Sequence, residues 1–243
     1  MKQNKTSLWL IRLLHFIIDE VILAVVILIF IFGIFSIRQD QKILSQAESN
    51  QYTQYSPEKD DGARYEELKR LNPDLRGWIT IFDTKIDYPV VQNSDEWDYL
   101  NRNAKREFSL SGSIYLEKDC SPNYQDAVNI LYGHHMAHDG MFGGIDHYEE
   151  RDYFDTHRKG LLYSDLEKYE IEIFAVFEAN AYDWSIYESN PVDMLAYLKE
   201  LAKRSLYFEG ECDELAQYRI VLLSTCSAAY NDDRHLLAAI IKE

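Results

Sequence analysis

Basic residues, cysteine, glycine and proline are all scarce in this sequence. Its 243 residues include 25 Lys and Arg against 41 Asp and Glu, which gives a formal charge of −16. A surface this acidic repels phosphate groups, so nucleic acid is not expected as a partner. With only 10 glycines and 5 prolines, collagen-like and low-complexity classes are excluded. The apolar fraction of 47%, with 18 Tyr and 11 Phe, instead predicts a packed core.

Cysteine occurs three times, so at least one thiol has no partner within the chain. In an exported protein an odd thiol is either reactive or forms an intermolecular link. A disulfide between Cys120 and Cys212 would leave Cys226 unpaired, but the sequence does not indicate that the first two lie close together. We expect Cys120 and Cys212 to be unpaired thiols that behave as small apolar side chains.

The N-terminus carries the only long uncharged apolar run. Residues 21–37 contain no charged side chain, and a helix needs roughly 17–25 such residues to cross a bilayer. No small-x-small cleavage site follows the run, so an uncleaved anchor is favoured over a cleavable signal peptide. The sequence therefore predicts a cytoplasmic tail and transmembrane anchor over residues 1–37, with the rest of a single-pass protein outside the cell membrane.

The remaining chain divides into a polar stalk and one domain. Residues 38–70 are polar and become helical near 65–71, and residues 71–243 are predicted to form the domain. Strand-like patterns cover residues 77–81, 86–91, 113–116, 128–132, 169–177, 218–225 and 235–241. Helices are expected within 141–154 and over 190–204, the second with Asn190 as its N-cap. This pattern predicts a mostly β fold with helical insertions, of the mixed antiparallel barrel type.

Two of these apolar strands end in residues that can carry out chemistry. His134 follows the strand at 128–132, and Cys226 follows the strand at 218–225. If the last two strands form a hairpin, Arg234 lies at the same rim as Cys226. A thiol, an imidazole and a guanidinium can together attack a carbonyl, protonate a leaving amine and support an oxyanion. From these residues alone, a structural cysteine and a solvated arginine remain open alternatives.

The histidines also raise the question of a metal site. His134 and His138 are four residues apart, which on a helix would allow both to bind one zinc ion. His135 adjoins them, and Asp139, Asp146 and His147 follow. The preceding run is strand-like, however, Asp139 and Gly140 indicate a turn, and no HExxH pattern occurs. We therefore predict neither a metal nor a cofactor.

Several dispersed motifs in this order resemble the class B sortases of Gram-positive bacteria. They are Tyr132-Gly133-His134 followed by Met141-Phe142, Leu223-Ser224-Thr225-Cys226 with a downstream arginine, Gly77-Trp78-Ile79, Ile86-Asp87-Tyr88-Pro89-Val90-Val91-Gln92, Tyr99-Leu100-Asn101 and Gly112-Ser113-Ile114-Tyr115. The resemblance covers residues 71–243. It implies an eight-stranded barrel preceded by an N-terminal helical extension and a transmembrane helix.

The resemblance also implies an activity, a cysteine transpeptidase that cleaves the C-terminal sorting motif of exported proteins. Cys226 is then the nucleophile, His134 its acid/base partner and Arg234 the oxyanion-side cation, and the implied substrate contacts are Leu100, Ser224 and Thr225. The implied partners are surface proteins that bear a sorting motif and an amine of the cell wall or its peptidoglycan precursor. A hydrolytic cysteine peptidase and a non-enzymatic surface binding module are the alternatives.

Overall fold

The computed structural model describes residues 5–93, 98–226 and 232–242, and leaves out the side chains of residues 5–7 and of Cys226. Two compact units make up the chain, Met1–Lys42 and Ile43–Glu243. The first unit is helical throughout its described part. Helix α1 (Lys5–Ala47) contains the predicted span 21–37 and runs without a break into the beginning of the second unit.

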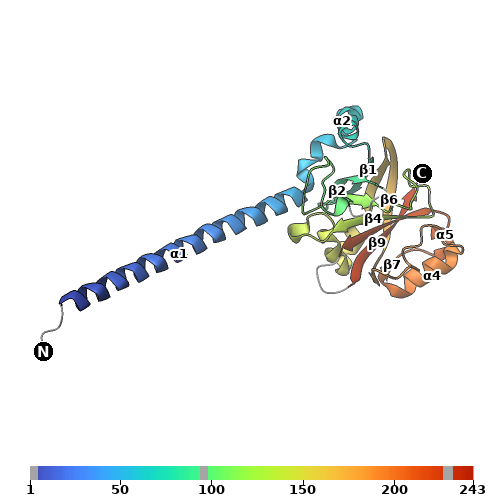
Figure 1. The fold of residues 1–243 in the computed structure, drawn as a ribbon. Coiled ribbons are helices and arrows are strands. Elements are labelled where there is room, and N and C mark those ends of the chain that lie inside the picture. Colours follow the sequence, from blue (N-terminus) through green and yellow to red (C-terminus); the bar gives the residue numbers. More distant parts are fainter. Residues whose placement is uncertain (1–4, 94–97, 227–231, 243) are drawn as a thin grey trace. The chain divides into compact units, whose positions relative to one another are not determined.

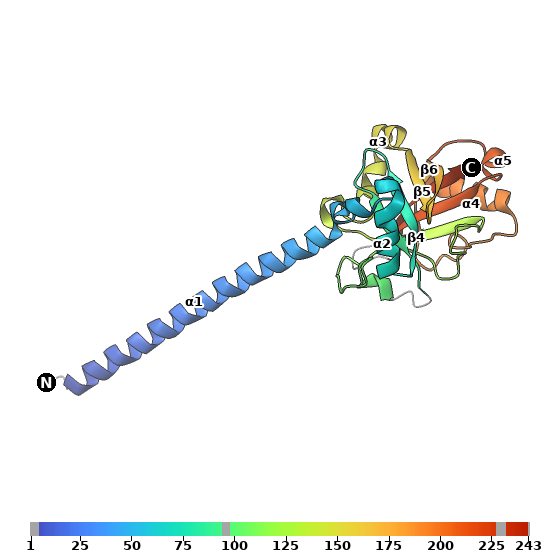
Figure 2. The same ribbon diagram turned by 90° about the horizontal axis from the view of Figure 1, so that it is seen from above.

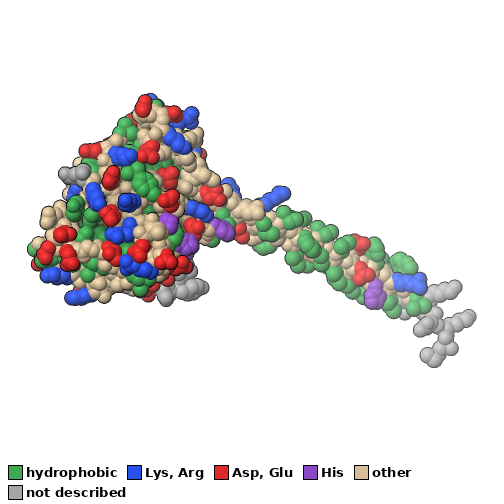
Figure 3. Space-filling model, turned by 180° about the vertical axis from the view of Figure 1, so that it is seen from behind, with side chains coloured by type: hydrophobic (Ala, Val, Ile, Leu, Met, Phe, Trp, Pro, Cys, Tyr) green, Lys and Arg blue, Asp and Glu red, His purple; other side chains and the backbone are tan. Residues whose placement is uncertain are grey.

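Most of the length of α1 is covered by exposed hydrophobic side chains (Figure 3). Within the described residues it is the one helix that is long and apolar enough to cross a membrane. A helix with hydrophobic residues on all sides is either buried in protein or surrounded by lipid. Because these side chains are exposed in the isolated chain, the helix is suited to a lipid environment.

The second unit is a closed β-barrel (Figure 1). Its described strands are β1 (Leu75–Ile81), β2 (Asp87–Val91), β3 (Ile114–Leu116), β4 (Val128–His134), β5 (Lys159–Ser164), β6 (Glu167–Asn180), β7 (Ser205–Phe208), β8 (Arg219–Cys226) and β9 (Asp233–Lys242). The order β1-β2-β3-β4-β8-β9-β6-β5 closes when β5 pairs with β1, and β7 adds to the outside of β6. The predicted eight-stranded barrel is confirmed.

Strands β5 and β7 are the two that the sequence patterns do not predict. All residues of β5 after Lys159 are buried, so the strand shows no alternation of apolar and polar side chains. β7 has only four residues and pairs along one side only, with β6. Both strands therefore lack the local pattern on which strand prediction depends.

The helices of the second unit lie around the barrel, with α2 and α4 on different sides of it (Figures 1 and 2). They are α2 (Ala63–Leu71), α3 (Arg151–Thr156), α4 (Met194–Arg204) and α5 (Cys212–Leu215). The described residues also form short 3-10 helices ahead of α2 and between strands, namely η1 (Ser49–Gln51), η2 (Thr53–Tyr55), η3 (Asp60–Gly62), η4 (Asp98–Leu100), η5 (Ala137–Asp139) and η6 (Gly143–Glu149). The helix expected within 141–154 is thus split between η6 and α3.

Helix α4 begins later than predicted, and Asn190 is not its N-cap. The cap is Asp193, whose carboxylate accepts a hydrogen bond from the backbone N–H of Ala196 at 2.9 Å. The side chain of Asn190 instead forms hydrogen bonds with the residues just ahead of β4. Its side-chain oxygen accepts from the N–H of Ala127 at 3.2 Å, and its amide donates to Asp126 at 2.8 Å.

The chain ahead of β1 packs on the barrel from residue 43 onward. The hydroxyl of Tyr88, on β2, donates to the carbonyl of Ala47 at 2.7 Å and accepts from the N–H of Met141 at 2.9 Å. Ala47 is itself buried. These contacts join the last turn of α1 to both β2 and the segment after β4, so part of the segment predicted as a stalk belongs to the second unit.

Strands β4, β8 and β9 present two different faces. One alternate set of their side chains packs in a cluster with α4, and we call this the α4 face; it includes Val128, Ile130, Ile220, Leu222, Leu236 and Ala238. The other set packs in the larger cluster, which we call the barrel face; it includes Leu131, Val221, Leu223, Leu237 and Ala239. Side chains alternate along a strand, so neighbouring residues of one strand serve opposite faces.

Candidate active site

The ends of β4 and β8 lie side by side. These two strands are parallel, and their register runs from Val128 opposite Ile220 to His134 opposite Cys226. Both strands end at this last pair. The backbones of adjacent strands are about 4.8 Å apart, so the positions of His134 and Cys226 are immediate neighbours although 92 residues separate them in sequence.

Arg234 lies at the same end of the barrel, near the beginning of β9. Strand β9 is antiparallel to β8, and the register runs from Arg219 opposite Ile241 to Ser224 opposite Leu236. Continued by two residues, the same register brings position 234 opposite position 226. The structure therefore brings together the positions of all three predicted catalytic residues, on three adjacent strands.

The three positions also share a face. His134 belongs to the same alternate set as Ile130, and Arg234 to the same set as Leu236, both of which lie on the α4 face. Position 226 is in the alternate set of Leu222, which lies on that face too. The side chain of Cys226 is outside the described part of the chain, and its thiol is therefore not located.

The ring of His134 is held by the segment that leads into β3. Its Nε2 lies 2.9 Å from the backbone carbonyl of Leu100. A carbonyl only accepts hydrogen bonds, so Nε2 carries a proton and Nδ1 is the nitrogen that can gain or lose one. Gly112 closes over the ring, since a Cβ added there would lie 3.1 Å from His134 Cδ2. The imidazole is thus half-buried with a fixed orientation.

A cavity of about 590 Å³ adjoins Arg234. Five aromatic side chains contribute to its walls, which is why we call it the aromatic cavity, and the rings of Tyr132 and Tyr187 stack at 6.1 Å. Burial raises the pKa of Tyr132, so this phenol stays protonated. No carboxylate in the described part of the chain forms an ion pair with Arg234, so its charge can serve a ligand. The cavity is lined by Leu100, Tyr115, Glu117, Lys118, Asp119, Tyr132, Ala181, Tyr182, Trp184, Tyr187, Glu188, Ser189 and Arg234.

The predicted substrate contacts have different positions. Leu100 lines the cavity and binds His134 through its carbonyl. Ser224 is buried beside the cavity, with its hydroxyl 3.3 Å from that of Tyr187. Thr225 is buried in the alternate set of the barrel face, where its hydroxyl accepts from the N–H of His235 at 3.1 Å. Contact of Ser224 and Thr225 with substrate stays a prediction.

An acidic and histidine cluster lies on the opposite face of these strands, and the sequence predicted none of its contacts, although His135 and Asp146 were considered for a metal site. Asp146 contacts both His135 and His235, the residues that directly follow His134 and Arg234. Adjacency to two candidate catalytic residues is the signal that would have singled out these histidines. Their shared carboxylate has no such signal, because Asp146 lies in a separate turn.

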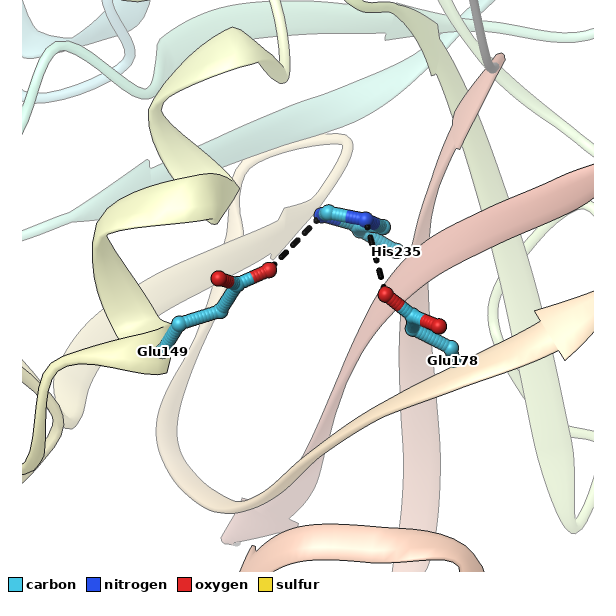
Figure 4. A group of neighbouring side chains, drawn as sticks. All are labelled: Glu149, Glu178 and His235. Carbon is cyan, nitrogen blue, oxygen red and sulfur yellow. Dashed lines mark ion pairs between the residues drawn. The ribbon is translucent and has the colours of Figure 1, made fainter. Parts of the chain in front are cut away.

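The same cluster contains a group that resembles a metal site in composition. Oxygens of Glu149 and Glu178 and a ring nitrogen of His235 lie within 4.8 Å of one another. Figure 4 shows, however, that the two carboxylates contact different nitrogens of the ring, at 3.5 Å to Nδ1 and 3.2 Å to Nε2. Each carboxylate therefore contacts a ring nitrogen of its own rather than converging on one. His138, the other histidine considered for zinc, is exposed on η5 and shares no helix with His134.

The other two cysteines are unpaired, as expected. Cys120 is buried, and desolvation raises the pKa of its thiol to about 12, whereas Cys212 is half-buried at the start of α5. The thiolate is the reactive form of cysteine. Cys120 is therefore unsuited to nucleophilic chemistry at neutral pH.

Comparisons with known proteins agree with one another. A family of sortase domains matches residues 79–241. The chain is 36% identical over 162 residues to sortase B of Listeria monocytogenes, a match that covers 66% of this chain and 65% of that protein, slightly under two thirds of its length. It is 28% identical over 181 residues to sortase B of Staphylococcus aureus, with 74% of each covered. The crystal structure of a mutant form of Clostridium perfringens sortase B aligns with a TM-score of 0.71 at 31% identity, covering 80% of this chain and 96% of that one.

Proposed function

We propose that this chain, which belongs to the sortase family and is a class B member of it, uses Cys226, His134 and Arg234 to transfer exported proteins to an amine. Sortases are cysteine transpeptidases that act on proteins bearing a sorting motif and on amine acceptors. The assignment of these three catalytic residues rests on one observation, that their positions lie at the same end of three adjacent strands, β4, β8 and β9. His134 and Cys226 are register partners, and Arg234, the second residue of the neighbouring strand β9, belongs to the same face.

The reaction follows from the chemistry of these groups. The thiolate of Cys226 attacks the carbonyl carbon of the scissile amide, and Arg234 stabilises the resulting oxyanion. As the C–N bond breaks, His134 donates the Nδ1 proton to the leaving amine, and a thioester remains on Cys226. An acceptor amine then attacks the thioester, transfers a proton to His134 and releases the thiolate. Atoms and charge balance without a metal or cofactor.

The aromatic cavity is the proposed binding site for the sorting motif. It begins at Arg234 and Leu100, beside the ring of His134, and extends along Tyr132 and Tyr187. Its apolar walls can enclose a short extended peptide, with a few polar groups to fix the direction of the chain. We include Leu100, Ser224 and Thr225 as substrate contacts on the strength of the family resemblance.

The location follows from α1. We propose that residues 1–37 form the cytoplasmic tail and anchor, residues 38–70 the extension, and residues 71–243 the catalytic barrel outside the cell membrane. A helix of this length and composition supports a single membrane span. On this topology the natural acceptor is an amine of the cell wall or of its peptidoglycan precursor.

The test compares Cys226→Ala with the unmutated chain. Each protein in detergent is incubated with a sorting-motif peptide and an amine, and the products are identified by mass spectrometry. We expect the unmutated chain to form a thioester and a peptide–amine adduct, and Cys226→Ala to form neither. Cys212→Ala is the matched control, since it removes a half-buried thiol remote from the strand ends and should keep full activity.

Three outcomes would contradict the proposal. Equal amounts of adduct from Cys226→Ala and from the unmutated chain would exclude Cys226 as the nucleophile. If neither protein forms an adduct, a non-enzymatic binding module is favoured. A hydrolysed peptide without adduct, at saturating amine, would instead identify a cysteine peptidase. Loss of adduct in Cys212→Ala but not in Cys226→Ala would assign the chemistry to a different thiol.

A further inference from the structure

A single carboxylate connects the two strands that flank the nucleophile strand. Oxygen Oδ2 of Asp146 lies 2.6 Å from Nε2 of His135, and Oδ1 lies 2.9 Å from Nδ1 of His235. His135 directly follows β4, and His235 is in β9. Strand β8, which ends at Cys226, lies between them in the sheet. Asp146 therefore links β4 and β9, the neighbours of β8 on either side, near the residue at which β8 ends.

The connection is made on the side opposite the proposed catalytic groups. His134 and Arg234 belong to the α4 face, and side chains alternate along a strand. Their neighbours His135 and His235 therefore belong to the other face. Each histidine is the neighbour in sequence of a proposed catalytic residue, so any shift of the histidine also moves the backbone of that residue. The spacing between β4 and β9 thus sets the distance between the imidazole and the guanidinium.

Between β8 and β9, the described backbone pairing does not reach this end of the sheet. The described ladder between β8 and β9 stops at Ser224 and Leu236. Beyond it, the hydrogen bond from the N–H of His235 to the hydroxyl of Thr225 is the next described link. The bridge through Asp146 therefore acts where the regular ladder has ended.

Asp146 is itself held firmly in relation to β4. It lies in η6, which begins directly after Phe142, and the N–H of Phe142 donates to the carbonyl of His134 at 3.0 Å. The turn packs so tightly on the end of β4 that a Cβ on Gly143 would come within 2.1 Å of the carbonyl oxygen of Met136. Asp146 thus reaches β9 from a turn that is fixed to β4.

Further carboxylates surround the ring of His235. Glu149 lies 3.5 Å from its Nδ1 and Glu178 lies 3.2 Å from its Nε2, on either side of the ring as drawn in Figure 4. With Asp146, three acidic side chains therefore face one imidazole. Both ring nitrogens have acceptors, and this fixes the ring plane as well as its position.

We propose that Asp146 is a positioning residue for transpeptidation: through His135 and His235 it fixes the ends of β4 and β9, and with them His134 and Arg234, around the strand that carries Cys226. This inference rests on the proposed function of those three residues. A carboxylate is required because each histidine donates to a different oxygen of the same group. Asparagine offers only one acceptor oxygen, so it keeps both links only if one of the two imidazoles changes tautomer and accepts from the amide.

The test uses Asp146→Ala and Asp146→Asn in the full chain, with kcat, the KM for the sorting-motif peptide and Tm measured for each. A displacement of about 1 Å between reacting groups is enough to lower the rate ~10- to 100-fold, so we expect a loss of kcat in that range for Asp146→Ala. Of the residues that line the aromatic cavity, Arg234 is the one that Asp146 positions, so we expect KM to change much less than kcat. Asp146→Asn should fall between Asp146→Ala and the unmutated chain.

Asp139→Ala is the matched control. Asp139 also pairs with a histidine, His147, at 2.9 Å, and is exposed to a similar degree, but it touches neither β4 nor β9 in the described contacts. We expect Asp139→Ala to keep its kcat. An active unmutated chain together with an equally active Asp146→Ala would overturn this inference alone. An equal loss of kcat in Asp139→Ala, or a loss in Asp146→Ala that disappears once activity is corrected for the folded fraction, would also overturn it. An unmutated chain that forms no adduct would overturn the proposed function and this inference with it.

Discussion

One added carbon at Gly112 disturbs the site at a defined point. The residue has a φ of +60°, and a Cβ would lie 2.6 Å from the carbonyl oxygen of Tyr99 and 2.7 Å from that of Leu100. The carbonyl of Leu100 is the group that binds His134 Nε2 at 2.9 Å. Gly112→Ala must therefore displace the hydrogen-bond partner of the imidazole and press on the ring, because the new carbon would also lie 3.1 Å from His134 Cδ2.

The expected effects on stability and activity have separate causes. The left-handed backbone conformation costs an alanine roughly 1–2 kcal/mol. Relief of the overlap with two backbone carbonyls adds about 1–3 kcal/mol. We therefore expect the free energy of unfolding of Gly112→Ala to fall by ~2–5 kcal/mol. Displacement of His134 from Cys226 should lower kcat ~10- to 100-fold. KM should change less than kcat, because Leu100 is the one residue lining the aromatic cavity that the added carbon meets.

Gly210→Ala separates the two effects. Gly210 also has a positive φ, +99°, but a Cβ there meets nothing closer than Leu215 at 3.5 Å, an ordinary contact. This variant should lose only the backbone contribution of roughly 1–2 kcal/mol and keep its kcat. The assays are urea unfolding and transpeptidation of a peptide at saturating amine. Equal values of kcat for Gly112→Ala and Gly210→Ala would refute the role of the Leu100 carbonyl in orienting His134.

Three further predictions concern thiol reactivity, pH dependence and helix capping. Because desolvation raises the pKa of Cys120 to about 12, iodoacetamide at pH 8 should modify this thiol only after unfolding; modification of the native chain, detected by mass spectrometry, would contradict this. The hydrogen bond from Lys242 holds the pKa of Glu172 below its usual value, with Arg158 contributing. The folded pKa lies below the unfolded one, so this stabilisation is present above the unfolded pKa and is lost as the pH falls through the folded pKa. Lys242→Met should therefore lower Tm more at pH 7 than at pH 3, and an equal loss at both would argue against the pairing. Asp193→Ala should lower the free energy of unfolding by about 1 kcal/mol through loss of the α4 cap, with kcat unchanged, and an unchanged unfolding midpoint in urea would show that the cap contributes nothing.

Much of this protein can be predicted from local patterns. An apolar run of the right length identifies the N-terminal helix, and strands with one buried face are visible through their alternation, as in β6. His134 and Cys226 stand out because each follows directly on an apolar strand. Local patterns fail where burial is complete, as in β5. They also fail where a side chain serves a distant element, as Asn190 does when it binds the start of β4 and leaves the cap to Asp193.

Local sequence patterns predict candidate catalytic residues at the ends of strands, the alternation of side chains between two strand faces, and a long apolar helix ahead of the barrel. Three features come from contacts between distant segments: β4 lies parallel to β8, the carbonyl of Leu100 orients His134, and Asp146 joins His135 to His235. The physical reason is that periodicity reports the face on which a side chain lies, whereas the identity of the neighbouring strand depends on packing between distant segments. A backbone carbonyl is the same in every residue, so no sequence pattern marks the one that binds a catalytic ring.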